Sequence, residues 1–181
     1  SARPDAAPKG AIRRKTDMLL RSRNGETTMA KPERILVLDG HPDDDSLCRS
    51  LGAAYERGAI EGGAQVRRTV VAHLEFDPVL HHGFRKRTEL EKDLVQAQQD
   101  ILWAEHVVVV LPIWWSDMPA LLKGFVDRVF LPGFAFKYRE KGLLWDKFLK
   151  GRSARIVYTQ DAPDWYYRFL VGRPVVRILK K

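Results

Sequence analysis

Two adjacent tryptophans follow a very apolar run and could provide a surface for a planar ring. Four consecutive valines occupy residues 107–110, and Ile113, Trp114 and Trp115 come directly after Pro112. Indole rings at the end of a buried strand offer flat apolar surface on which an aromatic ligand can stack. An isolated tryptophan pair is more often part of a core or an interface, so the pair alone leaves both interpretations open.

A second segment, Gly40-His41-Pro42-Asp43-Asp44-Asp45-Ser46, has residue types that suit an anion site. We expect it to lead from a strand into a helix, where free backbone N–H groups and the helix dipole favour a bound anion. Ser46 can cap the helix or donate its hydroxyl to a phosphate, and His41 can donate a ring N–H. The three aspartates oppose a phosphate unless their side chains point outward. This loop alone is equally compatible with an ordinary capped turn.

Residues 41–45 of this segment are also similar to the HPDD[E] metal motif of the zinc-dependent sugar deacetylases. In that motif a histidine and an aspartate bind zinc and another aspartate acts as a base. The site also needs a later histidine pair, and the remaining histidines lack the helical spacing of such a pair: His73, His81, His82 and His106. A zinc-dependent deacetylase is therefore the weakest alternative, and we expect no metal site.

Strand and helix patterns alternate from Arg34 onward, and these elements must position both segments. Such alternation implies an α/β fold, a doubly wound parallel sheet with helices on both faces. Ligands of such sheets bind beyond the carboxyl ends of the strands, where we find the loops 40–46, 112–118 and 160–167. The expected strands are 35–38, 65–72, 106–111 and 154–159. The first expected helix begins after Ser46 and runs to about Glu61. The others are 88–104, 120–130 and most of 166–181.

Composition places the chain among globular proteins of one domain. It has 181 residues, of which 45% are hydrophobic and 30% charged, with a single cysteine. One cysteine cannot form a disulfide framework, and this absence fits a cytoplasmic protein. No apolar run is long enough to cross a bilayer, so we expect no membrane span. Half of the net charge of +8 lies in residues 1–28, where seven Lys/Arg face three acids, so we expect no nucleic-acid partner. We interpret 1–28 as a disordered N-terminal extension and 29–181 as the folded domain.

The stretch 107–138 closely resembles the NAD(P)H:quinone oxidoreductases of the flavodoxin-like superfamily. Residues 112–124 are similar to their P-[IL]-x-W-x-x-x-P-A-x-L-K-G passage, and residues 127–136 read D-R-V-F-x-x-G-F-A-F. The opening GHPDDDSL resembles the family's [GA]-H-x-x-x-x-S-[FL] flavin-phosphate loop, and similarity extends over about 34–180. The resemblance implies a flavodoxin-like three-layer fold with four strands in the order 2-1-3-4. A fifth strand and last helix would lie beyond residue 181, so we interpret the chain as truncated at its C-terminus.

The resemblance implies cofactor contacts at all three strand exits. The first loop would meet the flavin phosphate or diphosphate through His41, Ser46, Leu47 and Cys48. The second would run beside the isoalloxazine ring with Pro112, Ile113, Trp114 and Trp115. The turn after the fourth strand would close over the ring's other side with Thr159, Gln160, Asp161 and Ala162. Relatives commonly have Phe-Asn in place of Leu47-Cys48. The resemblance therefore does not decide between FMN and FAD as the cofactor.

The resemblance also implies an activity, the transfer of two electrons from NAD(P)H to a quinone or similar acceptor. Tyr166 or Tyr167 would face the substrate and supply a proton, and Phe136 and Tyr138 would contribute to a pocket across the interface of a homodimer. The alternative is a flavin-binding regulatory or electron-carrier module without turnover of its own.

Overall fold

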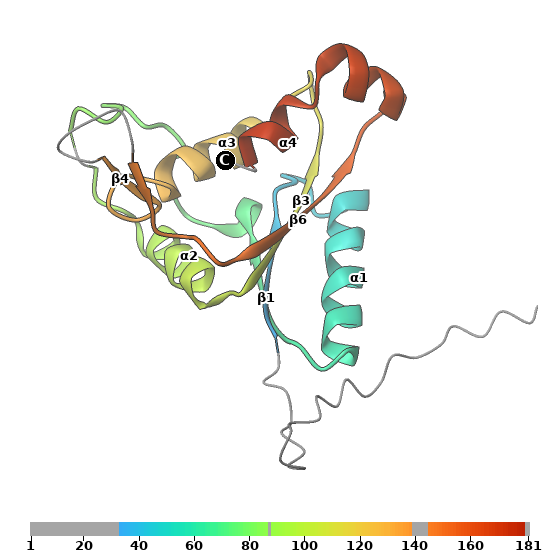
Figure 1. Cartoon of the computed structure of the whole chain (residues 1–181), viewed down its shortest axis with the longest axis horizontal. Coiled ribbons are helices and arrows are strands. Elements are labelled where there is room, and N and C mark those ends of the chain that lie inside the picture. Colours follow the sequence, from blue (N-terminus) through green and yellow to red (C-terminus); the bar gives the residue numbers. More distant parts are fainter. Residues whose placement is uncertain (1–32, 87, 139–144, 180–181) are drawn as a thin grey trace, which may run out of the picture. The chain divides into compact units, whose positions relative to one another are not determined.

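The computed structural model of the chain describes residues 33–86, 88–138 and 145–179. All of these belong to one compact unit, residues 32–181 (Figure 1). The predicted N-terminal extension, 1–28, lies outside the described residues. None of the described helices combines the length and apolar character that crossing a bilayer requires.

A four-stranded parallel sheet forms the middle of the domain. Its strands are β1 (Arg34–Asp39), β2 (Gln65–Val70), β3 (His106–Pro112) and β6 (Ser153–Thr159). They lie in the order β2-β1-β3-β6, which confirms the predicted order because β6 is the fourth strand of this sheet. In the register, Asp39 is opposite both Val70 and Val110, and Pro112 is opposite Thr159. The carboxyl ends of the strands therefore meet at one edge.

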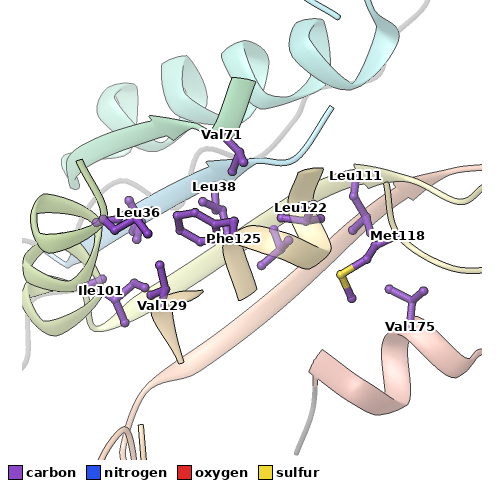
Figure 2. Close-up of a cluster of buried hydrophobic side chains, with 14 residues drawn as sticks. Leu36, Leu38, Val71, Ile101, Leu111, Met118, Leu122, Phe125, Val129 and Val175 are labelled. Carbon is purple, nitrogen blue, oxygen red and sulfur yellow. The ribbon is translucent and has the colours of Figure 1, made fainter. Parts of the chain in front are cut away.

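Helices cover both faces of the sheet, as Figure 1 shows. Side chains alternate along a strand, so Ile35 and Val37 of β1 pack under α1 (Leu47–Glu61), while Leu36 and Leu38 face the other side. There α2 (Lys92–Trp103) and α3 (Ala120–Val129) cover them. The larger core on this side is shown in Figure 2, where Phe125 and Leu122 of α3 are among the buried side chains. The result is the predicted three-layer architecture.

Two boundaries of the main strands and helices differ from the predicted ones by more than one residue. The second strand ends at Val70, and a 3-10 turn, Val71–His73, follows it instead of two more strand residues. The second helix begins at Lys92, four residues later than predicted. Glu91, with an extended backbone, is the N-cap of this helix. The segment before it is held by Arg128 of α3, whose guanidinium donates to the Glu89 carbonyl at 3.2 Å and to the Glu91 carboxylate at 2.7 Å.

The connection between α3 and β6 contains two short strands that the sequence did not predict. They are β4 (Phe136–Tyr138) and β5 (Trp145–Lys147), which pair antiparallel. Three-residue strands are too short to show an alternating pattern. Near the end of the chain the expected helix is split into a π-helical turn (Tyr166–Val171) and α4 (Pro174–Leu179). Gly172 and Arg173 separate them with φ values of 80° and 51°, outside helical geometry.

Candidate functional site

The first loop connects β1 to α1 and is held by side chains of its own. Ser46 is the N-cap of α1, as predicted, and its Oγ accepts from the Arg49 N–H at 3.2 Å. His41 Nδ1 accepts from the Asp43 N–H at 2.9 Å. In the neutral ring the proton is therefore on Nε2, which leaves a donor for a ligand. The Asp45 N–H donates to Asp43 at 3.0 Å, so this carboxylate is occupied within the loop.

The second loop is a tight two-residue turn. Trp114 and Asp117 exchange both backbone hydrogen bonds at 2.9 Å. The two residues between them, Trp115 and Ser116, have φ values of 51° and 67°, as a type I′ turn requires. The turn leaves the Trp115 side chain fully exposed and Trp114 45% exposed. The two indoles are thus displayed at the strand exit and are not part of the core.

The third loop follows β6 and leads into the π-helical turn. Gln160 Nε2 donates to the Ala162 carbonyl at 2.9 Å, which closes the turn. Tyr166 is exposed, whereas the neighbouring Tyr167 is buried against Tyr158, with ring centroids 5.7 Å apart. Burial raises the pKa of the Tyr167 hydroxyl, so it keeps its proton at neutral pH.

Specific contacts join the three loops into one site. The His41 and Trp114 rings meet edge to face with centroids 5.4 Å apart, which joins the first loop to the second. The Ile113 N–H donates to the Thr159 carbonyl at 2.8 Å, which joins the second to the third. Cys48 Sγ lies 3.3 Å from Thr159 Oγ1, which joins the first to the third. Burial raises the pKa of this thiol, consistent with a packing role for Cys48.

A cavity of about 240 Å³ lies between the second and third loops. This is near the lower end of the sizes of small-molecule sites. Two polar atoms of its lining residues are buried and make no hydrogen bond within the described ranges: Gln160 Oε1, an acceptor, and the Tyr167 hydroxyl. The lining residues are Ile113, Trp115, Ser116, Gln160, Asp161, Ala162, Tyr166 and Tyr167. The residues around the cavity thus combine apolar surface with a buried amide oxygen and a buried hydroxyl that has a proton to donate.

A buried charge network lies beneath the first loop, and the sequence reasoning missed it. Asp39, fully buried at the end of β1, accepts from Arg68 Nη2 at 3.0 Å, and Arg49 Nε lies 3.7 Å from the same carboxylate. Arg49 also pairs with Asp44, at 2.5 Å. The one signal in the sequence was Arg68, a charged residue on the strand face that packs against α1.

The structure places most of the predicted residues around this site. Leu47 is exposed at the start of α1, and Pro112 is buried at the end of β3. The Thr159 side chain faces Cys48 and does not line the cavity. Phe136 lies on β4 and does not line the cavity either, and the Tyr138 side chain lies outside what the structure describes. The predicted roles of all these residues stay predictions.

Comparison with known proteins identifies the family. A family model described as the flavodoxin-like fold matches residues 33–177. The chain belongs to this flavodoxin-like family. This membership favours the flavin interpretation of the first loop over the zinc-hydrolase alternative.

Several relatives in this family have names that describe redox enzymes. The chain is 32% identical over 106 residues to an uncharacterized NAD(P)H oxidoreductase of Haemophilus influenzae, covering 56% of this chain and 52% of that protein. It is 31% identical over 168 residues to mouse ribosyldihydronicotinamide dehydrogenase [quinone], covering 77% of this chain and 72% of that protein. The chain spans about half the length of the first curated relatives it matches.

Solved structures agree with the fold. Smu.1420 from Streptococcus mutans superposes with a TM-score of 0.68 at 31% identity, covering 82% of this chain and 78% of that one. NAD(P)H:quinone oxidoreductase from Methanothermobacter marburgensis superposes with a TM-score of 0.65 at 21% identity, covering 82% of both chains. The second likeness is evidence for the fold alone.

Proposed function

We propose that this protein is a flavin-dependent oxidoreductase that transfers two electrons from NAD(P)H to a quinone or similar acceptor. The observation that carries the proposal is the cavity of about 240 Å³ at the meeting point of the strand exits, with two unsatisfied polar atoms beside an exposed indole. The names of the Haemophilus influenzae and mouse relatives support the same class of reaction.

The residues of the site fit a flavin. The His41 Nε2–H, the Ser46 hydroxyl and the N-terminus of α1 suit its phosphate. The Trp115 indole suits the face of its ring, and Gln160 Oε1 suits an N–H group on the polar edge of that ring. When bound, the flavin would supply the chemistry of hydride acceptance and donation.

The chain's own residues would orient the reactants and supply a proton. NAD(P)H and the acceptor would both need the exposed face of the bound flavin and would therefore use one position in turn, which predicts ping-pong kinetics. Backbone N–H groups of Trp115 and of the 160–162 turn would stabilise negative charge that develops on a bound ring. Tyr167 is one of the residues around the cavity, and its hydroxyl, which holds its proton at neutral pH, would donate that proton to the quinone oxygen. A homodimer, with Phe136 and Tyr138 near the partner's pocket, stays part of the proposal.

Steady-state kinetics of the flavin-loaded protein test the proposal. We expect oxidation of NADH or NADPH that depends on added quinone, with parallel double-reciprocal lines. Tyr167→Phe should lower kcat for quinone reduction roughly a hundredfold, the scale of a lost general acid, without changing flavin affinity. The matched substitution at a tyrosine remote from the cavity, Tyr55→Phe on α1, should leave kcat within about twofold. No quinone-dependent oxidation with either nucleotide would contradict the proposal.

A further inference from the structure

The chain just after the third loop displays a group of large apolar side chains. Trp165, Phe169 and Leu170 are 59%, 73% and 68% exposed, and Tyr166 is 44% exposed. Exposed apolar residues that are scattered singly over a surface are ordinary. Four of them within six residues form a patch, and exposed patches mark contact with a partner or a membrane. We call these four side chains the apolar patch.

The π-helical turn (Tyr166–Val171) determines which side chains face outward. In a π-helix residue i is bonded to residue i+5, so Trp165 and Leu170 lie on one side of the turn. Tyr167 points the other way, is 2% exposed and packs against Tyr158 of β6. The buried side anchors the turn to the domain. The outward side chains are exposed to an extent that makes them project into solvent instead of lining a groove.

The chain around the apolar patch is basic. Residues 160–181 contain five Lys/Arg and two acids. One of the two acids, Asp164, is paired with Arg173 at 2.8 Å. Arg168 is exposed, and its guanidinium carbon lies 5.2 Å from the centre of the Phe169 ring. Positive charge therefore lies directly beside the projecting apolar side chains.

This combination suits the surface of an anionic bilayer better than a second copy of the chain or a nucleic acid. Tryptophan and tyrosine favour the membrane–water interface, and arginine is attracted to anionic headgroups. A second copy that bound through the same face would bring the same arginines to both sides of the contact, where like charges repel. Nucleic-acid bases stack on rings, and Leu170 has no ring to offer them.

We propose that the apolar patch and the arginines beside it form a docking surface for an anionic lipid bilayer. Trp165, Phe169 and Leu170 enter the interface, and Arg168 meets the headgroup phosphates. Tyr166 belongs to the patch and also lines the cavity, so docking places the cavity at the membrane surface, beside acceptors dissolved in the lipid. The proposal goes beyond the reaction proposed above and does not depend on it.

Co-sedimentation of the full chain with lipid vesicles tests the proposal. We expect binding to vesicles of phosphatidylcholine with phosphatidylglycerol, weaker binding in high salt, and little binding to phosphatidylcholine alone. Residues 1–28 are also basic, so variants in the patch decide the test. Phe169→Ser combined with Leu170→Ser should weaken binding roughly tenfold or more, because two apolar side chains are lost from the interface. Arg168→Gln should weaken it about fivefold, the effect of one arginine near an anionic surface.

Matched substitutions outside the patch are the controls. Phe84→Ser removes a side chain that is 68% exposed in the connection before α2, and Arg57→Gln removes an exposed charge on α1. Both should leave vesicle binding unchanged, and thermal unfolding shows whether each variant is folded.

Two results would overturn the proposal. One is that the natural sequence binds neither kind of vesicle, or binds no better than the patch variants do. The other is that the patch variants turn a dimer into a monomer in light scattering while vesicles bind none of the proteins, which would make this face a contact between copies. Reduction of a water-soluble quinone in the absence of vesicles is measured separately, so the function proposed above stands or fails independently of these results.

Discussion

Trp115 and Ser116 adopt a backbone conformation that residues with a side chain rarely adopt. Their φ values of 51° and 67° lie in the left-handed region, which costs about 1–2 kcal/mol per residue. Type I′ turns usually have Asn-Gly at these positions. Here the turn carries Trp-Ser, and its effect is to present a fully exposed indole beside the cavity. Strain of this kind is concentrated at functional sites, where the surrounding structure holds it in place.

Replacing Ser116 by glycine should relieve part of this strain. Glycine adopts positive φ without a Cβ clash, so Ser116→Gly should raise the free energy of unfolding by about 1 kcal/mol. Chemical denaturation measures the change. Ser116→Ala keeps the Cβ and is the matched control, which should show no gain. If the glycine variant were no more stable than the alanine variant, the left-handed turn would be contradicted.

At the level of elements, α3 holds the long connection between the 3-10 turn after β2 and α2. Its Arg128, 1% exposed, donates to the carbonyl of Glu89 and to the carboxylate of Glu91, and it also contacts the Asp77 carbonyl. Burial raises the pKa of Glu91, but hydrogen bonds from the Asp77 N–H and the charge of Arg128 outweigh it, so the pKa is lowered. Gly124 lies one turn before Arg128 and lets the connection pass close to the helix.

A pair of glycine substitutions tests this close approach. A Cβ at Gly124 would lie 2.6 Å from the Pro78 carbonyl oxygen, so Gly124→Ala should destabilise the protein by about 1–3 kcal/mol. Gly58, in the last turn of α1, has no neighbour within 4 Å of such a Cβ. Gly58→Ala should therefore stabilise by about 1 kcal/mol through helix propensity. Equilibrium unfolding compares the two, and a stabilising Gly124→Ala would contradict the described packing.

The elements differ in how much of them the sequence could predict. The alternation of short apolar runs with helical periodicity, together with the family motifs, was sufficient for the four main strands, their order and the helices on both faces. The start of α2 was not predicted, and the segment before it is held by Arg128, 37 residues after Glu91, in a contact that no local pattern contains. Likewise Asp39 and Arg68 pair although they are 29 positions apart, so no local sequence pattern could predict this pair. The motifs indicated the three loops that the structure brings together, while the charges beneath the first loop depended on tertiary contacts.

At the scale of the whole molecule, the parallel sheet is what brings the site together. The strands end in register, so loops that are some 70 and 50 residues apart in sequence are joined by His41–Trp114, Ile113–Thr159 and Cys48–Thr159 contacts. The same edge of the sheet carries the first turn of α1, the exposed indoles and the Gln160 turn. The central claim is that this arrangement binds a flavin whose ring is accessible to both reactants.

The most direct test of this claim is a visible absorption spectrum. The protein is mixed with flavin, unbound flavin is removed, and the spectrum of the protein is recorded. The account predicts that flavin bands stay with the protein, disappear when NADH or NADPH is added without oxygen, and return when a quinone follows. A protein that stays colourless after exposure to FMN and FAD would contradict it, and so would bound flavin that neither nucleotide can reduce.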